Sequence, residues 1–367
     1  MVTSIKPITI LGAGQIGFAI AVLLRQAGGY DVCIADRDAG RLKQLADQGF
    51  EVMVVDKEDS LAGAASGRYA VLNALPFHRA ITVATLCAEA GVHYFDLTED
   101  VRSTQAIRAL AASARTVLMP QCGLAPGFIG IVGNDLARRF DRLLDLHMRV
   151  GALPRYPVNR LRYNLTWSTE GLINEYCNPC DALVDGEPTQ VMALEGHETF
   201  ALDGVEYEAF NTSGGLGTLT ETLRGKARNV DYKSVRYPGH CAIMKLLLND
   251  LRLRERRDLL KDIFEAAIPA TDQDVIVVFV TASGYRHQRL VQDSYSARLM
   301  GTQIGGHRLS AIQLSTASGI CAALDLVAQG ALPQSGFIGQ ERIGLEQFLN
   351  NRFGQACAER APEASHA

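Results

Sequence analysis

In the amino-terminal third of the chain, short apolar runs rich in β-branched residues alternate with amphipathic helical segments. Strands that alternate with helices in this way are typical of a parallel sheet with helices on both faces. The pattern therefore predicts an α/β fold built on a doubly wound parallel sheet. Its six strands are expected at Ile8–Leu11, Asp31–Ala35, Glu51–Val55, Ala70–Ala74, Tyr94–Leu97 and Thr116–Met119.

After the sixth strand the pattern changes to strands with one exposed face, which predicts a second, α+β domain on a largely antiparallel sheet. Its strands are expected in the segments LLDLHMRV, LRYNLTW, TQVMALE, VEYEAF and DVIVVFVTA. The long helix LSAIQLSTASGICAALDLVAQG and the short helix GLEQFLNNRF then return the chain to the first domain. The expected organisation is a first domain of residues 1–124 and 306–353, a second of residues 125–305, and a disordered tail of residues 354–367.

Composition and charge exclude several functional classes. The 367 residues carry 47% apolar and 21% charged side chains and a net charge of -4, so no basic surface for nucleic acid is expected. The longest apolar run, Ile16–Leu24, is far too short to span a membrane, and the amino terminus has no secretion signal, which favours a cytoplasmic location. Of the eight cysteines only Cys177 and Cys180 form a close pair, and nothing completes a metal site around them.

A glycine-rich turn between the first two strands carries the clearest motif. The segment GAGQIG has the G-x-G-x-x-G spacing, follows a strand and opens a helix, and Asp36 ends the second strand nineteen residues after its last glycine. This unit is typical of a Rossmann domain that holds a dinucleotide pyrophosphate at the helix amino terminus. Asp36 favours NAD over NADP, whereas its neighbour Arg37 weakens that preference. The expected cofactor-binding residues are Gly12, Gly14, Gln15, Ile16, Gly17, Asp36, Arg37 and, after the third strand, Asp56.

The carboxyl ends of the fourth and fifth strands are the expected place for the nicotinamide, because ligands of doubly wound sheets lie outside those ends. Ala74, Leu75 and Pro76 follow the fourth strand and are expected to contact the cofactor. Asp96 ends the fifth strand and is a candidate catalytic acid or base, with a turn-forming or capping role as the alternative.

The segment LTWSTEGLINEY is expected to lead a strand into a helix, with Glu170 in the first helical turn. Glu170 is a candidate catalytic acid that meets a substrate amine, although an acid at a helix amino terminus is also favoured by the helix dipole alone. Thr166 is expected to line the substrate pocket. Trp167 is a second candidate there, with core packing as its alternative role.

Seven blocks, found in order along nearly the whole chain, resemble the lysine 6-dehydrogenases within the wider saccharopine dehydrogenase family. The blocks are ILGAGQIG, NALPFHRA, YFDLTE, CGLAPGF, YNLTWSTEGLINEYCNP, EYEAFNTSGGLGTLTETL and VRYPGHCAIMKLL. The resemblance implies a Rossmann domain, a second domain with the substrate pocket and the dimer interface, a nicotinamide cofactor and a homodimer.

The reaction that the resemblance implies is NAD-dependent oxidation of the lysine ε-amine to 2-aminoadipate 6-semialdehyde, which cyclises, with release of ammonia. The last two blocks then supply Arg236 for the substrate carboxylate, His240 as a proton shuttle and Thr212 as a further substrate contact. A saccharopine dehydrogenase, whose longer substrate needs a second cationic cluster, is the alternative enzyme; Arg160 and Arg162 are the candidates for it, and the sequence shows no concentrated cluster. An NAD-binding protein without turnover is the alternative outside enzymes.

Overall fold

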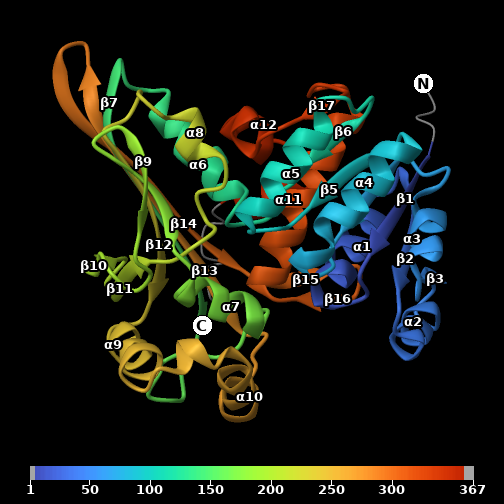
Figure 1. The fold of residues 1–367 in the computed structure, drawn as a ribbon, viewed down its shortest axis with the longest axis horizontal. Coiled ribbons are helices and arrows are strands. Elements are labelled where there is room, and N and C mark those ends of the chain that lie inside the picture. The colour runs from blue at the N-terminus through green and yellow to red at the C-terminus, as the bar shows by residue number, and fades with distance from the viewer. Residues whose placement is uncertain (1–4, 359–367) are drawn as a thin grey trace, which may run out of the picture. The chain divides into compact units, whose positions relative to one another are not determined.

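The computed structural model describes residues 5–358, which form two compact units. The first is built by the chain up to Phe128 and by Gln303–Leu309 and Gln313–Cys357, and the second by Ile129–Thr302 with Ser310–Ile312. The sequence pattern placed the domain boundary after residue 124, a few residues before the division at Phe128. Figure 1 labels the elements of both units.

The first unit is a seven-stranded sheet in the order β17-β6-β5-β4-β1-β2-β3, and every pairing in it is parallel. The order reverses between β1 and β4, as in a doubly wound dinucleotide-binding sheet. The six predicted strands are confirmed with small shifts at their ends, and β17 adds an edge. The strands are β1 (Lys6–Leu11), β2 (Tyr30–Asp36), β3 (Glu51–Val54), β4 (Ala70–Asn73), β5 (His93–Asp96), β6 (Val117–Met119) and β17 (Gly336–Phe337).

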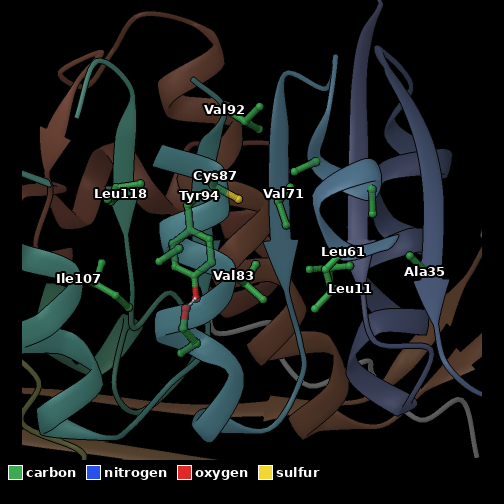
Figure 2. Packing of buried hydrophobic residues seen from close by; sticks show 14 of the residues in the cluster. Leu11, Ala35, Leu61, Val71, Val83, Cys87, Val92, Tyr94, Ile107 and Leu118 are labelled. Carbon is green, nitrogen blue, oxygen red and sulfur yellow. Dashed lines mark hydrogen bonds between the residues drawn. The ribbon is translucent and has the colours of Figure 1, made fainter. Parts of the chain in front are cut away.

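Helices cover both faces of this sheet, because alternate strand residues point to opposite sides. On one face, α3, α4 and α5 share a core with Leu11, Val71 and Leu118 (Figure 2). On the other face α1 packs beside Ile10 and borders α11. The helices are α1 (Gln15–Ala27), α2 (Ala39–Ala46), α3 (Glu58–Ala65), α4 (Ala80–Ala90), α5 (Val101–Ala111), α11 (Ala311–Ala328) and α12 (Leu345–Leu349), with short 3-10 turns at Phe77–Arg79, Gln340–Arg342 and Gly354–Cys357.

The two predicted carboxyl-terminal helices are confirmed as α11 and α12. Among the described residues, α11 is the one helix long and apolar enough to cross a membrane, yet 78% of it is buried inside the protein, as in a core helix. The predicted disordered tail begins too early at residue 354. The Asn351 side chain accepts hydrogen bonds from the Phe353 and Gly354 amides, and Cys357 is fully buried, so this turn is ordered. The rest of the predicted tail, from residue 359, lies outside the described residues.

The second unit contains a mixed, mostly antiparallel sheet in the order β10-β11-β12-β7-β13-β14, with β8 and β9 attached to β12. Among the pairings of this sheet in residues 5–358, that of β12 with β7 is parallel and the others are antiparallel. The strands are β7 (Arg142–Pro154), β8 (Cys180–Val184), β9 (Glu187–Val191), β10 (Glu198–Leu202), β11 (Val205–Asn211), β12 (Asn229–Arg236), β13 (Asp274–Arg286) and β14 (Arg289–Met300). A separate pair, β15 (Thr302–Ile304) and β16 (His307–Leu309), belongs to the first unit except for Thr302. The remaining helices are α6 (Phe128–Ala137), α7 (Thr169–Cys177), α8 (Leu219–Thr222), α9 (His240–Lys245) and α10 (Arg257–Ala267), with a π turn at Leu246–Asp250 and a 3-10 turn at Leu253–Glu255.

One predicted strand of the second unit is wrong. The segment Leu161–Trp167 is a loop that makes a single bridge, between Leu165 and Ala270. Its alternating apolar residues do not face a sheet. They pack into a core built by α7, α9 and α10, where Tyr163 is buried and Leu161, Leu165 and Trp167 are partly buried.

Candidate active site

The glycine turn has the geometry that a dinucleotide requires. Gly12 has φ +106°, and a Cβ on Gly17 would lie 1.8 Å from the Gly12 carbonyl oxygen, so neither position tolerates a side chain. A Cβ on Gly14 would meet nothing within 4 Å. The backbone at Gly14 is therefore open to a ligand at the amino terminus of α1, where Gln15 and Ile16 begin the helix, and these residues fit a pyrophosphate.

Asp36 is fixed by backbone donors beside this turn. Its Oδ2 accepts a hydrogen bond from the Ala13 amide at 2.6 Å and its Oδ1 accepts one from the Asp38 amide at 2.9 Å. Arg37 and Asp56 are exposed at the ends of their strands. Sequence reasoning missed Arg41, whose Nε donates to the Ala13 carbonyl at 3.1 Å and so brings a second arginine to the turn.

The segment after β4 lies against the glycine turn. The Ala74 carbonyl oxygen would be 2.9 Å from a Cβ on Gly12, and a Leu75 side-chain carbon would be 3.5 Å away. Ala74 and Leu75 are half-buried and Pro76 is exposed, so this segment forms one wall beside the glycine turn. Its position is held by Asn73, whose Oδ1 accepts the Leu75 amide.

Asp96 holds strand ends together instead of offering a free carboxylate. It is 1% exposed and accepts hydrogen bonds from the Tyr94 hydroxyl at 2.7 Å and from the Thr98 and Gln121 amides at 3.0 and 2.9 Å. Burial raises the pKa of the Asp96 carboxyl to about 6, against the opposing effect of these hydrogen bonds. The geometry favours the turn-forming alternative over the catalytic role expected from the sequence.

Asp96→Asn is therefore expected to fold, because an amide can accept from both backbone amides while Tyr94 donates to the Ala80 carbonyl, 3.2 Å away. In the wild type the folded carboxyl keeps its proton to about pH 6 and the ordinary value is 3.8, so its ionisation costs about 3 kcal/mol of stability as the pH rises through this range. The variant should lose that dependence in urea unfolding at pH 4 and pH 7. A hundredfold loss of turnover with intact stability would instead restore a catalytic role for Asp96.

In the second unit, the side chain of Arg236 is the centre of a buried polar cluster. It is 3% exposed at the end of β12, its Nε donates to the Tyr176 hydroxyl at 2.7 Å, and its Nη1 donates to the Val235 carbonyl at 2.8 Å. The guanidinium also lies 5.1 Å from the centre of the Tyr163 ring. Burial alone would lower the pKa of Arg236, but Tyr176, Tyr163 and Glu175 raise it above its usual value, so the cation is permanent.

His240 belongs to the same cluster, and its surroundings favour a structural role over the proton shuttle expected from the sequence. It is 2% exposed, its Nδ1 lies 2.9 Å from the Leu161 carbonyl oxygen, and its Nε2 lies 3.0 Å from the Tyr176 hydroxyl. Burial and the charge of Arg236 lower the pKa of His240 to about 3. The imidazole is therefore neutral at any pH at which the enzyme would work, and it contacts a carbonyl and a tyrosine.

The other predicted substrate residues separate into two groups. Thr166 lies beside Tyr163 in the cluster and is 6% exposed. Trp167 packs over the helix α7, where its ring is so close to Gly171 that a Cβ there would lie 2.4 Å from Cζ3. Thr212 is 2% exposed and its hydroxyl is 2.8 Å from that of Ser234. For Trp167 this favours the core-packing alternative, and for Thr212 the observed partner is Ser234.

Two acids on α7 differ in their surroundings. Glu170 is exposed in the first turn of the helix, which Ser168 caps by accepting the Gly171 amide at 3.1 Å. Glu175, which sequence reasoning did not select, has its Oε2 3.9 Å from the Arg236 Nη2. No sequence pattern around Glu175 indicates a role for it, because its neighbour Arg236 lies far along the chain, at the end of β12.

Metal chemistry finds no support in the part of the chain that the structure describes. Residues 5–358 contain no group of three His, Cys, Asp or Glu side chains that could hold a metal ion. Cys177 and Cys180 are free thiols at the two ends of the connection between α7 and β8. Burial raises the pKa of both, to about 12 for Cys180, so neither is a reactive thiolate.

A glycine turn that excludes side chains at Gly12 and Gly17, with an aspartate at the end of β2 of a parallel sheet, defines the first unit as a domain that binds a dinucleotide. The chain matches the Saccharopine dehydrogenase NADP binding domain over residues 8–119 and the Saccharopine dehydrogenase C-terminal domain over residues 123–353. It therefore belongs to the saccharopine dehydrogenase family. Its first unit carries the nucleotide-binding domain of that family.

Individual relatives are distant. Alpha-aminoadipic semialdehyde synthase, mitochondrial, from Rattus norvegicus is 20% identical over 196 residues, which are 51% of this chain, and the match spans 21% of the length of that relative. The apo saccharopine dehydrogenase (L-Glu forming) from Saccharomyces cerevisiae has a TM-score of 0.72 at 15% identity over 96% of both chains. The DAP dehydrogenase of C. glutamicum in complex with DAP has a TM-score of 0.51 at 14% identity over 94% of this chain and 95% of that one. At such identities these structures share the fold.

Proposed function

We propose that the protein is a lysine 6-dehydrogenase that oxidises the ε-amine of L-lysine with NAD. The observation that carries this proposal is the buried guanidinium of Arg236 beside Glu175, with Nη2 and Oε2 3.9 Å apart. One cation and one acid at this spacing fit the carboxylate and the ammonium of an α-amino acid. Arg160 and Arg162, the candidates for a second carboxylate site, are exposed, which favours a substrate with a single carboxylate over saccharopine.

The residues of this chain have three tasks in such a reaction. Arg236 binds the α-carboxylate and Glu175 the α-ammonium, which leaves the side-chain amine of the substrate to extend away from them. The ε-amine of lysine has a solution pKa of about 10.4, so it is an ammonium near neutral pH and must lose a proton before it can be oxidised. Glu170, which is exposed, takes this proton. NAD, when bound, accepts hydride from the carbon that carries this amine.

The proposal is tested with a substrate panel of lysine, ornithine, saccharopine and cadaverine, followed by the absorbance of NADH. Lysine is expected to give the highest kcat/KM, and ornithine to be poor because it is one methylene shorter. Reduction of NAD by saccharopine but not by lysine would assign the alternative enzyme. Tight NADH binding without turnover of any compound would support a binding protein.

We further propose NAD as the preferred cofactor, because the Asp36 carboxylate beside the glycine turn would repel a 2'-phosphate. Asp36→Ala should weaken NAD binding by about 1.5 to 3 kcal/mol, since charged hydrogen bonds are lost, and NADP binding much less. Asp38→Ala is the matched control, because Asp38 only caps α2 by accepting the Arg41 amide at 2.9 Å. Titration of both cofactors checks this, and an equal loss for NAD and NADP would contradict the preference.

Glu170→Gln tests the proposed base. The change keeps the shape of the side chain and removes its charge, so lysine turnover should fall at least about 100-fold while the melting temperature changes little. Ser168→Ala is the control, because it removes the cap of the same helix and leaves the acid in place. Equal losses of turnover in both variants, or normal kinetics in Glu170→Gln, would mean that the acid serves only the end of the helix.

A further inference from the structure

The hydrogen bonds around Arg236 have a fixed direction. The Leu161 carbonyl can only accept, so the Nδ1 of His240 carries the hydrogen of this 2.9 Å contact. The neutral imidazole then has a bare Nε2, which accepts from the Tyr176 hydroxyl at 3.0 Å. The oxygen of Tyr176 is left to accept from the Arg236 Nε at 2.7 Å. A buried chain from Leu161 to Arg236 thus holds the guanidinium by its Nε.

The rest of the guanidinium has unused donors. Of its five N–H groups, those at Nε and Nη1 make the two hydrogen bonds that the described residues provide. The Tyr163 and Thr166 hydroxyls lie close to each other, yet within residues 5–358 neither makes a hydrogen bond of good geometry, and these residues are 1% and 6% exposed. Buried polar groups are normally paired, so two such hydroxyls beside a guanidinium with spare N–H groups indicate a ligand.

The loop that carries these hydroxyls is held in place from both sides. Asn159 clamps Tyr163, because its Nδ2 donates to the Tyr163 carbonyl at 2.6 Å and its Oδ1 accepts the Tyr163 amide at 3.3 Å. Leu165 donates to the Pro269 carbonyl and accepts from the Thr271 amide, both at 3.0 Å. Tyr163 and Thr166 are therefore positioned by backbone contacts that do not need a ligand.

We propose that the Tyr163 and Thr166 hydroxyls donate to a substrate carboxylate bound at Arg236, and that His240 is a positioning residue that acts through Tyr176. The proposal rests on the proposed function for the identity of the ligand as an α-amino acid. A carboxylate has two oxygens in one plane, which suit the fork of an arginine and two further donors. Glu175 near Nη2 disfavours a dianion such as a phosphate, because its charge would face the second negative charge.

Binding of norleucine and norleucinamide to the full chain with saturating NADH tests the two hydroxyls. These compounds differ only in carboxylate against carboxamide, lack the ε-amine of lysine and cannot be oxidised while NADH is bound. Calorimetry should give at least about 10-fold tighter binding of norleucine to the wild type, since hydrogen bonds to a charged group are the stronger ones. Tyr163→Phe and Thr166→Val should each reduce this preference about threefold to tenfold and leave norleucinamide nearly unchanged.

Tyr207→Phe is the matched control for Tyr163→Phe. Tyr207 is also 1% exposed and its hydroxyl also has no hydrogen-bond partner among the described residues, but it lies on the β11 strand in a different core. This variant should keep the preference of the wild type. If Tyr163→Phe and Thr166→Val also keep it, or if they weaken both compounds equally, the assignment of the hydroxyls is wrong.

A double-mutant cycle tests His240. His240→Phe should reduce the preference for norleucine about fivefold or more when Tyr176 is present, and should have almost no effect in a Tyr176→Phe background, because the contact through which it acts is then absent. His240→Gln, whose side-chain oxygen can accept from Tyr176, should keep most of the preference, and His240→Leu replaces the phenylalanine variant if that variant does not fold. If His240→Phe lowers the preference equally with and without the Tyr176 hydroxyl, His240 only packs in the core and does not act through Tyr176.

The norleucine binding test and the lysine oxidation test can fail independently of each other. If lysine is not oxidised but the preference for norleucine depends on Tyr163 and Thr166, the carboxylate site stands and the reaction is wrong. If lysine is oxidised but the preference for norleucine does not depend on Tyr163 and Thr166, the proposed reaction stands and the proposed carboxylate site is wrong.

Discussion

Gly17→Ala is expected to destabilise the first unit by at least about 3 kcal/mol and to abolish NAD binding. The added Cβ would lie 1.8 Å from the Gly12 carbonyl oxygen and 3.5 Å from the Ile10 side chain, so the helix α1 must move away from β1. The Gly12 oxygen belongs to the backbone and Ile10 is fully buried, so neither can move aside without a shift of the surrounding structure. Urea unfolding measures the first effect, and fluorescence titration with NADH the second.

Gly14→Ala is the matched control within the same turn. Nothing lies within 4 Å of its added Cβ, and the φ of -69° suits any residue, so the melting temperature should stay within about 2 °C of the wild type. NADH binding should nevertheless weaken at least about 10-fold, because the methyl group occupies the approach of the pyrophosphate. Full binding by Gly14→Ala would mean that the dinucleotide does not lie on this turn.

Arg236→Ala is expected to raise the KM for lysine strongly while NADH binding stays unchanged. A substrate carboxylate left without its buried cation costs about 2 to 5 kcal/mol, which is roughly a 30-fold to several-thousand-fold loss in kcat/KM. Arg236→Lys keeps the charge but not the fork, so it should lose less. Michaelis constants for lysine, together with the melting temperature of each variant, measure the effect.

Cadaverine provides the internal control, because it has two amines and no carboxylate. Its weak turnover should be nearly the same in the wild type and in Arg236→Ala. Equal losses for lysine and cadaverine would show that Arg236 supports the fold of the second unit and does not bind the carboxylate.

The first unit was predictable because its elements are defined locally. The parallel strands are buried on both faces, so they appear as continuous apolar runs such as Ile8–Leu11, and Gly12 and Gly17 mark the turn where chain packing forbids a side chain. The strand ends shifted by one or two residues, at positions where hydrogen bonding alone decides where a strand stops.

The second unit was less predictable because its periodicity is ambiguous. Leu161–Trp167 has the alternation of a strand, but its apolar residues fill a helical core, and Leu165 pairs with Ala270 at one position only. The strand β12 was missed because Lys233 and Arg236 suggest an exposed surface. In the fold they are 8% and 3% exposed, and Lys233 lies 3.2 Å from Glu198.

The candidate site depended on contacts that no local pattern contains. Arg236 was identified from its block, but its relation to Glu175 and Tyr176 on α7 arises only when β12 joins the sheet. The neutral state of His240 likewise follows from burial beside Arg236. The sequence blocks identified Arg236 and His240 as candidates, whereas their burial in the fold determines their charge states.

The contact of Trp167 with Gly171 has a practical consequence. This is the only tryptophan of the chain, and its indole rests on Gly171 in the first turn of α7, while its backbone follows Thr166 directly and precedes Glu170 by three residues. Emission from tryptophan, excited selectively at long wavelength, therefore reports on this one location without a label. Amino-acid binding can be followed optically in the native chain, and a colour shift on addition of norleucine would reveal rearrangement of the loop in real time.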